Sequence, residues 1–121
     1  MPDAYDLKTS EPELYEKIVK FVGGTGAVTK VFGKGATVTY ISAGIVDVTF
    51  TDNPYTFVGL GGYGFEATTQ AALKGYSVVA GAFNATTKTL RLNVTNNLDA
   101  LTDLAALQSL TCRLLFKQTA V

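Results

Sequence analysis

The sequence predicts an all-β domain: an antiparallel β-sandwich or jelly-roll-like fold with one short helix near residues 98–107. The composition favours it, because 7 Phe, 6 Tyr and many Thr and Val suit pleated, half-buried strands, while 12 Gly suit turns and bulges. Several segments alternate apolar and polar side chains, and turn residues recur about every 8 to 12 positions, as in sandwiches. An open β-barrel is the second fold that this pattern allows.

The chain divides into an N-terminal arm, residues 1–16, and a single β-sandwich domain, residues 17–121. Its 121 residues and 12.8 kDa are the size of one domain. The first 16 residues hold five of the ten acids and one base, and Pro2 and Pro12 interrupt them. The surplus of acid predicts that the arm contacts a basic partner surface rather than the core.

The first half of the domain contains four expected strands, at residues 17–22, 28–32, 36–41 and 45–51. The last of these alternates most regularly, with Val46, Val48 and Phe50 on one face and Asp47 and Thr49 on the other. Such alternation predicts a hairpin of residues 37–50 with one buried and one wet face. We expect Gly33-Lys34-Gly35 to be a hairpin turn between the second and third strands.

The second half contains four further expected strands, at residues 55–58, 75–83, 88–95 and 110–118. Gly59–Gly64 is expected to be a glycine-rich loop, and Gly81 a bulge or a point of close approach. The last two strands should each bury one face. Those faces carry Leu90, Leu92 and Val94 in one strand, and Leu110, Cys112, Leu114 and Phe116 in the other.

A short helix is expected between the last two strands. Leu98, Leu101 and Leu104 recur at helical spacing, and Asp99 and Asp103 suit the first turn of a helix, where acids are favourable.

Charge and residue counts exclude several functional classes. The formal net charge is zero, which argues against nucleic-acid and anionic-membrane surfaces. The chain has no His and a single Cys, so a histidine-based nucleophile, an internal disulfide and a Cys/His zinc site are all impossible. We therefore expect no catalytic, cofactor-binding or metal-binding residues, and no cofactor. No apolar run approaches a membrane span, and the polar N-terminus is unlike a signal peptide.

Two glycine motifs resemble phosphate-binding loops but lack the required context. Gly59, Gly61 and Gly64 match G-x-G-x-x-G, yet no helix start follows and no acid lies about 20 residues beyond. Gly33-Lys34 would need Gly where Val28 stands and Ser or Thr at Gly35. Both motifs are therefore expected to be structural.

The remaining chemical candidates are a thiol and two acids. Cys112 should be a buried neutral thiol between two leucines of its strand. Asp47 and Glu66 are the acid pair that a small hydrolase would need, but nothing in the sequence fixes their separation. We expect that the protein is not an enzyme.

The strand-and-turn rhythm resembles a known family. The run KIVKFVGGTGAVTKVFGKGATVTYISAGIVDVTFTDN, residues 17–53, joins a basic-apolar strand to Gly-containing turns. KGYSVVAGA at residues 74–82, residues 87–94 and LAALQSLTCRLLFKQ at residues 104–118 fit the same rhythm. Together they resemble the small β-sandwich structural proteins of tailed bacteriophage virions, the capsid decoration or cement proteins.

The resemblance implies a virion protein on the capsid surface that binds the major capsid protein, itself, or both, as a homo-oligomer such as a trimer. It implies no catalytic residue, no nucleic acid and no membrane. The alternative is a tail or fibre β-domain that binds a host glycan or another virion protein, for which Tyr55, Tyr63 or Tyr76 would form an aromatic platform. An enzyme built on Asp47 and Glu66 is the third possibility.

Overall fold

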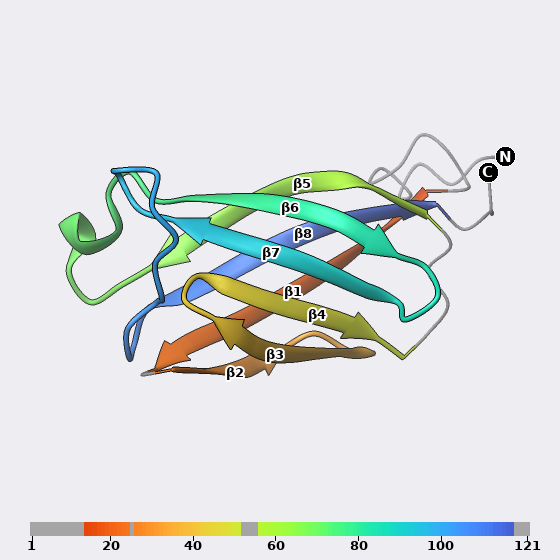
Figure 1. The fold of residues 1–121 in the computed structure, drawn as a ribbon, viewed down its shortest axis with the longest axis horizontal. Helices are drawn as coiled ribbons and strands as arrows, with labels where there is room; N and C mark the ends of the chain where they lie inside the picture. The colour runs from red at the N-terminus through yellow and green to blue at the C-terminus, as the bar shows by residue number, and fades with distance from the viewer. Residues whose placement is uncertain (1–13, 25, 52–55, 118–121) are drawn as a thin grey trace, which may run out of the picture.

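Alternating side chains along eight strands form two four-stranded antiparallel sheets, packed as a sandwich, in the computed structural model (Figure 1). The structure describes residues 14–24, 26–51 and 56–117. Sheet A has the order β2-β1-β8-β5, and sheet B the order β3-β4-β7-β6. The strands are β1 (Leu14–Gly24), β2 (Ala27–Phe32), β3 (Ala36–Ser42), β4 (Ile45–Phe50), β5 (Thr56–Glu66), β6 (Ser77–Asn84), β7 (Thr89–Thr95) and β8 (Ser109–Lys117). The all-β sandwich is confirmed, and the open barrel is not formed.

The predicted hairpin is confirmed in its register. In β3 and β4, Val38 pairs with Val48 and Thr37 with Thr49. Val46, Val48 and Phe50 are at most 3% exposed, whereas the residues between them keep partial contact with water. A period of two therefore separates a core face from a solvent face, as one buried side of a sheet requires.

The core lies between the sheets and is centred on β7 and β8. The inward side chains of these two strands are at most 2% exposed: Leu90, Leu92, Val94, Leu110, Cys112, Leu114 and Phe116. β8 pairs with β1 on one side and with β5 on the other, so it is the inner strand of sheet A beside β1. The predicted inward faces of both strands are confirmed.

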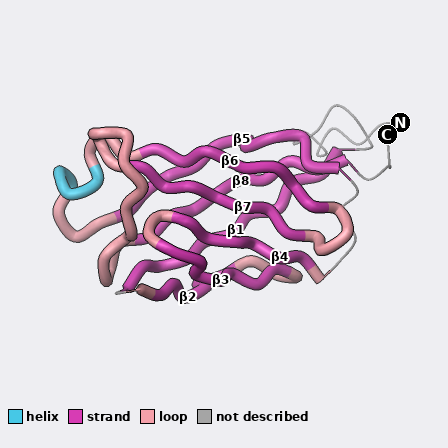
Figure 2. The backbone as a smooth tube through the Cα atoms, viewed as in Figure 1, coloured by secondary structure: helices cyan, strands magenta, loops and turns pink. Residues whose placement is uncertain are grey.

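The helix predicted near residues 98–107 is wrong. This segment is a loop (Figure 2), and the one helical element in the described part of the chain is a short 3-10 turn, η1 (Gln70–Leu73). Asn96 Oδ1 accepts hydrogen bonds from the backbone N–H groups of Leu98 at 2.8 Å and Ala100 at 3.2 Å. Such side-chain bonds compete with helical backbone bonds. Leu98 is 79% exposed, so the leucine spacing marks no buried helical face.

Gly59–Gly64 is not a loop but the middle of β5, at the rim of sheet A. β5 pairs with β8 through its backbone along its whole length, with register shifts between Phe57 and Gly59 and between Leu60 and Gly62. A ladder needs only backbone donors and acceptors, so glycine can occupy it despite a weak strand preference.

The turn at Gly33-Lys34-Gly35 exists, but it is not a hairpin turn. β2 belongs to sheet A and β3 to sheet B, so the turn carries the chain from one layer to the other. Lys30 Nζ donates to the carbonyl oxygens of Gly33 at 3.1 Å and Ala36 at 2.8 Å, which holds the two sides of this crossover together.

The start of β1 differs from the expected one, whereas the bulge at Gly81 matches its prediction. β1 begins at Leu14, three residues before the expected strand, and Tyr15 pairs with Phe116 of β8. The rest of the expected arm, residues 1–13, lies outside the described residues. The bulge predicted at Gly81 is confirmed by a register shift between Ala80 and Phe83.

The hairpin register predicts opposite effects for two neighbouring substitutions in β4. Val48→Asp places an unpaired charge where the native side chain is 0% exposed, and should cost about 4 kcal/mol or more, enough to unfold the domain. Thr49→Asp faces the wet side and should cost about 1 kcal/mol or less. Chemical denaturation followed by circular dichroism measures both. Equal losses would mean that the register is wrong.

Candidate functional site

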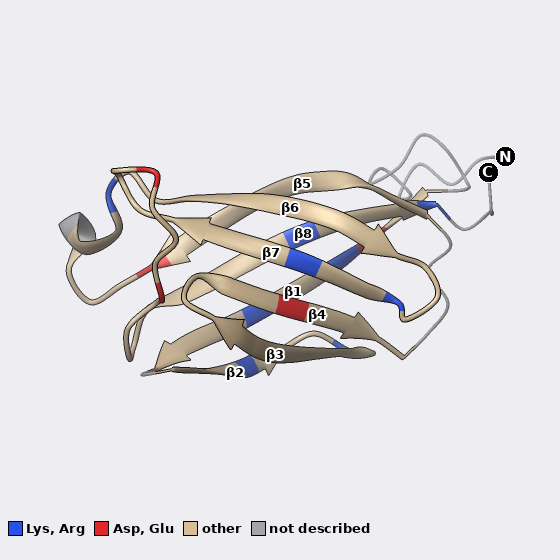
Figure 3. Ribbon diagram, viewed as in Figure 1, with Lys and Arg blue, Asp and Glu red and all other residues tan. Residues whose placement is uncertain are grey.

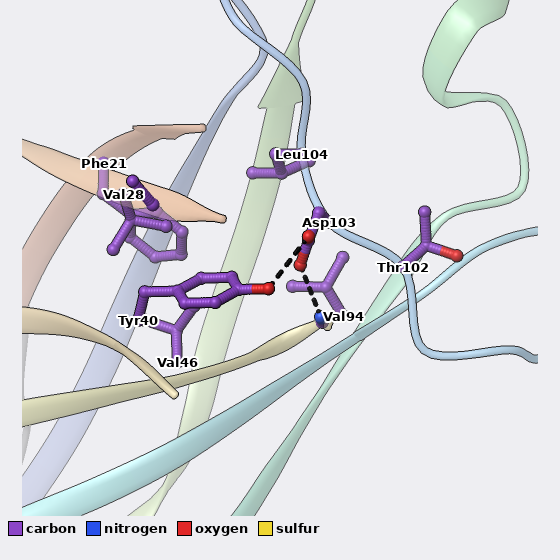
Figure 4. Close-up of a pocket in the computed structure, with 10 residues that line it drawn as sticks. Phe21, Val28, Tyr40, Val46, Val94, Thr102, Asp103 and Leu104 are labelled. Carbon is purple, nitrogen blue, oxygen red and sulfur yellow. Dashed lines mark hydrogen bonds between the residues drawn. The ribbon is translucent and has the colours of Figure 1, made fainter. Parts of the chain in front are cut away.

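A small cluster of polar groups ties the 96–108 loop to the β3–β4 hairpin (Figure 4). Tyr40 Oη donates to Asp103 Oδ2 at 3.0 Å, and the backbone N–H of Gly44 donates to Asp103 Oδ1 at 2.8 Å. Partial desolvation raises the pKa of Tyr40, and its hydrogen bond to Asp103 raises it further. Asp103 therefore has a structural role, but the expected role at a helix N-terminus is wrong.

The surroundings of Gly44 explain why the loop closes at this point. The φ angle of Gly44 is 72°, and a Cβ there would lie 2.6 Å from the backbone nitrogen of Thr102 and 2.7 Å from the carbonyl oxygen of Val94. Only glycine allows that approach. The remaining cavity, lined also by Phe21, Val28 and Leu104, measures about 10 Å³, which is the room of about one water molecule. It is a packed junction rather than a ligand pocket.

Asp47 and Glu66, the acid pair that the third possibility of an enzyme would require, do not meet. Asp47 in β4 faces outward from sheet B, where it pairs with Arg91, and Glu66 in β5 faces outward from sheet A, where it pairs with Ser109. Figure 3 marks the acidic and basic positions along the strands. Arg91 donates to Asp47 through Nε at 2.8 Å and Nη2 at 3.1 Å, and this fork raises the pKa of Arg91. Lys20 Nζ lies 2.5 Å from Glu66 Oε1. Its hydrogen bond holds the pKa of Glu66 below the usual value.

Cys112 is a buried thiol, as predicted. Its side chain is 0% exposed in the middle of β8, and burial raises its pKa to about 12. The thiolate is the reactive form of cysteine, so a thiol with this pKa is inert at neutral pH.

The outer face of sheet B carries neutral polar groups that bind each other across strands. Thr49 and Thr89 hydroxyls lie 3.1 Å apart, and Ser77 and Thr95 hydroxyls 2.8 Å apart. Next to the Asp47–Arg91 pair this face has a shallow hollow of about 520 Å³, which is lined by Asp47, Gly81, Ala82, Asn84, Thr87, Thr89 and Arg91. Because the side chains are already held by each other, the face loses little side-chain entropy when it is covered.

Two of the three tyrosines named for the aromatic platform of the alternative function lie in the described part of the chain. Tyr55 lies outside the described residues. Tyr63 is 44% exposed and meets Phe65 edge to face at 5.7 Å, and Phe65 meets Tyr76 in the same way at 6.0 Å. The rings therefore form a chain of perpendicular contacts along the rim between β5 and β6. The sequence pattern does not predict these contacts, because Phe65 directly follows the glycine-rich segment that was expected to be a loop.

The comparisons with known proteins give no relatives: no family model, curated protein or solved structure matches the chain. Among the described residues, no group of three or more His, Cys, Asp or Glu side chains could hold a metal ion. Over the same ranges, no helix is long and apolar enough to cross a membrane.

Loss of the Asp103 carboxylate should loosen the junction between loop and hairpin. Asp103→Ala leaves the Tyr40 hydroxyl and the Gly44 N–H without their partner, and should cost about 1–3 kcal/mol of unfolding free energy. Tyr40→Phe removes one of the two bonds and should cost less. Asp99→Asn, a loss of charge in the same loop, is the control and should be neutral. Urea denaturation of the four proteins measures the order, and a neutral Asp103→Ala would contradict this role.

The ion pair of Glu66 should make stability depend on pH in the acid range. Its pKa in the folded protein lies below the ordinary value of 4.5, so its contribution is present above that value and is lost as the pH falls through the lowered pKa. Glu66→Gln should therefore lose less stability than the wild type between about pH 5 and pH 3. Thermal unfolding across that range measures the difference, and parallel curves would show that the pair has no effect.

Proposed function

We propose that the protein is a non-enzymatic structural protein of a tailed-bacteriophage virion, a capsid decoration (cement) protein that binds the head shell and stabilises it. Two observations support this proposal: the resemblance of residues 17–53 and of the later strands to that family, and the two-sheet sandwich that those strands form. Its partner is then the major capsid protein on the outer surface of the particle.

The main observation in favour of the proposal is the chemistry of the outer face of sheet B. Its threonine, serine and Asp47–Arg91 pairs make a neutral surface with fixed hydrogen-bonding groups. Charged side chains are depleted in the cores of protein interfaces, and a surface whose rotamers are already fixed can be buried at low entropic cost. A protein that must cover another protein over a broad area needs such a face.

The use of the carboxylates supports a non-enzymatic role. Asp47, Glu66 and Asp103 each bind a partner within the chain, and Glu16 Oε2 accepts a hydrogen bond from Arg113 Nε at 2.9 Å. An acid–base catalyst needs a carboxyl group aimed at a substrate site with a shifted pKa. These four side chains instead hold strands and a loop in place.

A tail or fibre domain that binds a host glycan is the second candidate. A hollow of about 500 Å³ beside Tyr76 is also lined by Lys74, Asn96 and Asn97. Phe65 contacts the rings of both Tyr76 and Tyr63, so the aromatic surface continues from this hollow to Tyr63. Aromatic rings beside amide groups suit sugars, which present apolar faces and hydroxyl groups. A glycan array tests this candidate directly.

The decoration assignment predicts where the protein is found. Mass spectrometry of purified virions should detect it at a fixed copy number relative to the major capsid protein. Particles stripped of the protein should rebind the wild type. Absence from purified particles would refute the assignment.

A matched pair of variants tests which face binds. Thr89→Arg adds an unpaired charge to the outer face of sheet B and should weaken rebinding at least about tenfold, because burial of such a charge is costly. Thr111→Arg makes the same change on the outer face of sheet A and should rebind like the wild type. Both variants must keep the wild-type thermal transition. Equal effects would show that sheet B is not the binding face.

A further inference from the structure

β5 lies at the rim of sheet A, and β8 is its one strand neighbour in the described part of the chain (Figure 1). It is 11 residues long, and its single charged side chain, Glu66, is neutralised by Lys20. Edge strands of monomeric proteins are usually short or protected by charges, proline or β-bulges, because unpaired backbone groups recruit other strands. β5 is long and carries almost no charge, so its two register shifts are the only protection of this kind in it.

The inward side chains of β5 leave one side of the core half open. Phe57, Leu60 and Phe65 pack against the core, but no residue of β5 is fully buried. Tyr63, which pairs with the inward Cys112, remains 44% exposed. An apolar row along an open sheet edge therefore still contacts water.

The outward side of β5 has no side chains along its middle. Gly59, Gly62 and Gly64 pair with outward residues of β8. A Cβ added at Gly59 or Gly64 would meet nothing within 4 Å, and one at Gly62 only the Cδ atom of Arg113 at 3.8 Å. The φ angles of Gly59 (158°) and Gly62 (156°) favour glycine at the two register shifts of this ladder, whereas neither φ nor packing within the chain explains Gly64. Glycine inside a strand weakens it, and often marks a place where another backbone approaches.

We propose that β5 pairs antiparallel with β5 of a second copy around a two-fold axis at Gly62, which joins the two A sheets into one eight-stranded sheet. The ladder that β8 forms with β5 skips Val58 and Gly61. If the β5–β5 ladder also skips these two residues, the two-fold axis places Phe57 opposite Phe65 of the second copy, and Leu60 opposite its Tyr63. Both pairs face inward and extend the core, and such aromatic and aliphatic cross-strand pairs stabilise sheets.

Self-complementarity is the reason for choosing a second copy over an unrelated chain. A two-fold interface must match itself, so each residue must suit the one that the symmetry places opposite. Here Gly59 meets Gly64 on the outward side, and Glu66 meets Thr56, so no like charges face each other. The formal net charge of zero removes general repulsion between copies. The inference does not depend on the virion assignment.

The first experiment is sedimentation equilibrium of the purified full chain. The wild type should have twice the monomer mass of 12.8 kDa. Tyr63→Lys should raise the dissociation constant of the dimer at least about tenfold, because the ammonium group is in water in the monomer and desolvated in the dimer. Val79→Lys, at a 57% exposed position on the edge strand of sheet B, is the matched control and should leave the constant unchanged.

Three results of this experiment would overturn the proposal. The first is a wild type that is still monomeric at a protein concentration of about 100 μM, which is 100-fold above the micromolar range expected in cells. The others are a trimeric wild type and equal dimer affinities for the wild type and Tyr63→Lys. Thermal unfolding of each variant establishes that the monomer is folded.

The second experiment tests the register with disulfide trapping. Thr56 and Glu66 face each other across the proposed interface, but within one chain they are about 30 Å apart, at opposite ends of β5. The double variant Thr56→Cys/Glu66→Cys should therefore oxidise to a covalent dimer, and neither single variant should. The native Cys112 gives no background, because it is 0% exposed. Covalent dimers from a single variant, or a dimeric double variant that does not cross-link, would refute this pairing.

Discussion

The packing of Phe116 between the two sheets is the contact on which the sandwich depends. Its ring lies 5.0 Å from that of Phe50, 5.5 Å from those of Phe57 and Phe83, and 5.8 Å from that of Tyr15. These four rings come from β4, β5, β6 and β1, so one side chain of β8 touches both layers and both neighbours of its own strand. The edge-to-face contacts add stability beyond the area that they bury. The position of β5 and the direction of its side chains follow from this cluster.

Hydrogen bonds hold the loop of residues 96–108 at the far end of the sandwich. There the 96–108 loop crosses from sheet B to sheet A, and Asp103 fastens it to Tyr40 and Gly44. The backbone continues the closure, since Thr102 donates to the carbonyl oxygen of Val94 at 3.0 Å and Gly23 to that of Gln108 at 2.8 Å. A loop that satisfies its polar groups in this way can cover the core without a helix.

The strands with one buried face could be predicted from the sequence, because burial imposes a period of two on the side chains themselves. The β3–β4 hairpin and the inward faces of β7 and β8 came directly from that period. β5 could not, because its glycines have no side chain to alternate and its ladder is supplied by β8, some 50 residues later. The leucines at 98–107 imitate helical spacing, and the bonds that decide against a helix include one from Tyr40, 63 residues away.

The candidate site was less predictable than the fold for the same reason. Asp47, Glu66 and Asp103 were visible as acids, but their partners depend on which strands become neighbours. Arg91 reaches Asp47 because β7 pairs with β4, and Lys20 reaches Glu66 across β8. Only the sheet order reveals that Asp47 and Glu66 are neutralised within the chain.

That internal neutralisation determines what kind of recognition is left to this molecule. Charges that are paired within the chain contribute little long-range attraction, so these two sheet surfaces would not steer a partner by charge. The recognition proposed here would rest on fixed hydroxyl groups on sheet B, and on backbone groups and half-buried rings along β5. Contacts of this kind depend on shape and close approach, and they weaken little with added salt. They suit a module that covers a protein surface in a lasting assembly better than one that captures a charged ligand from solution.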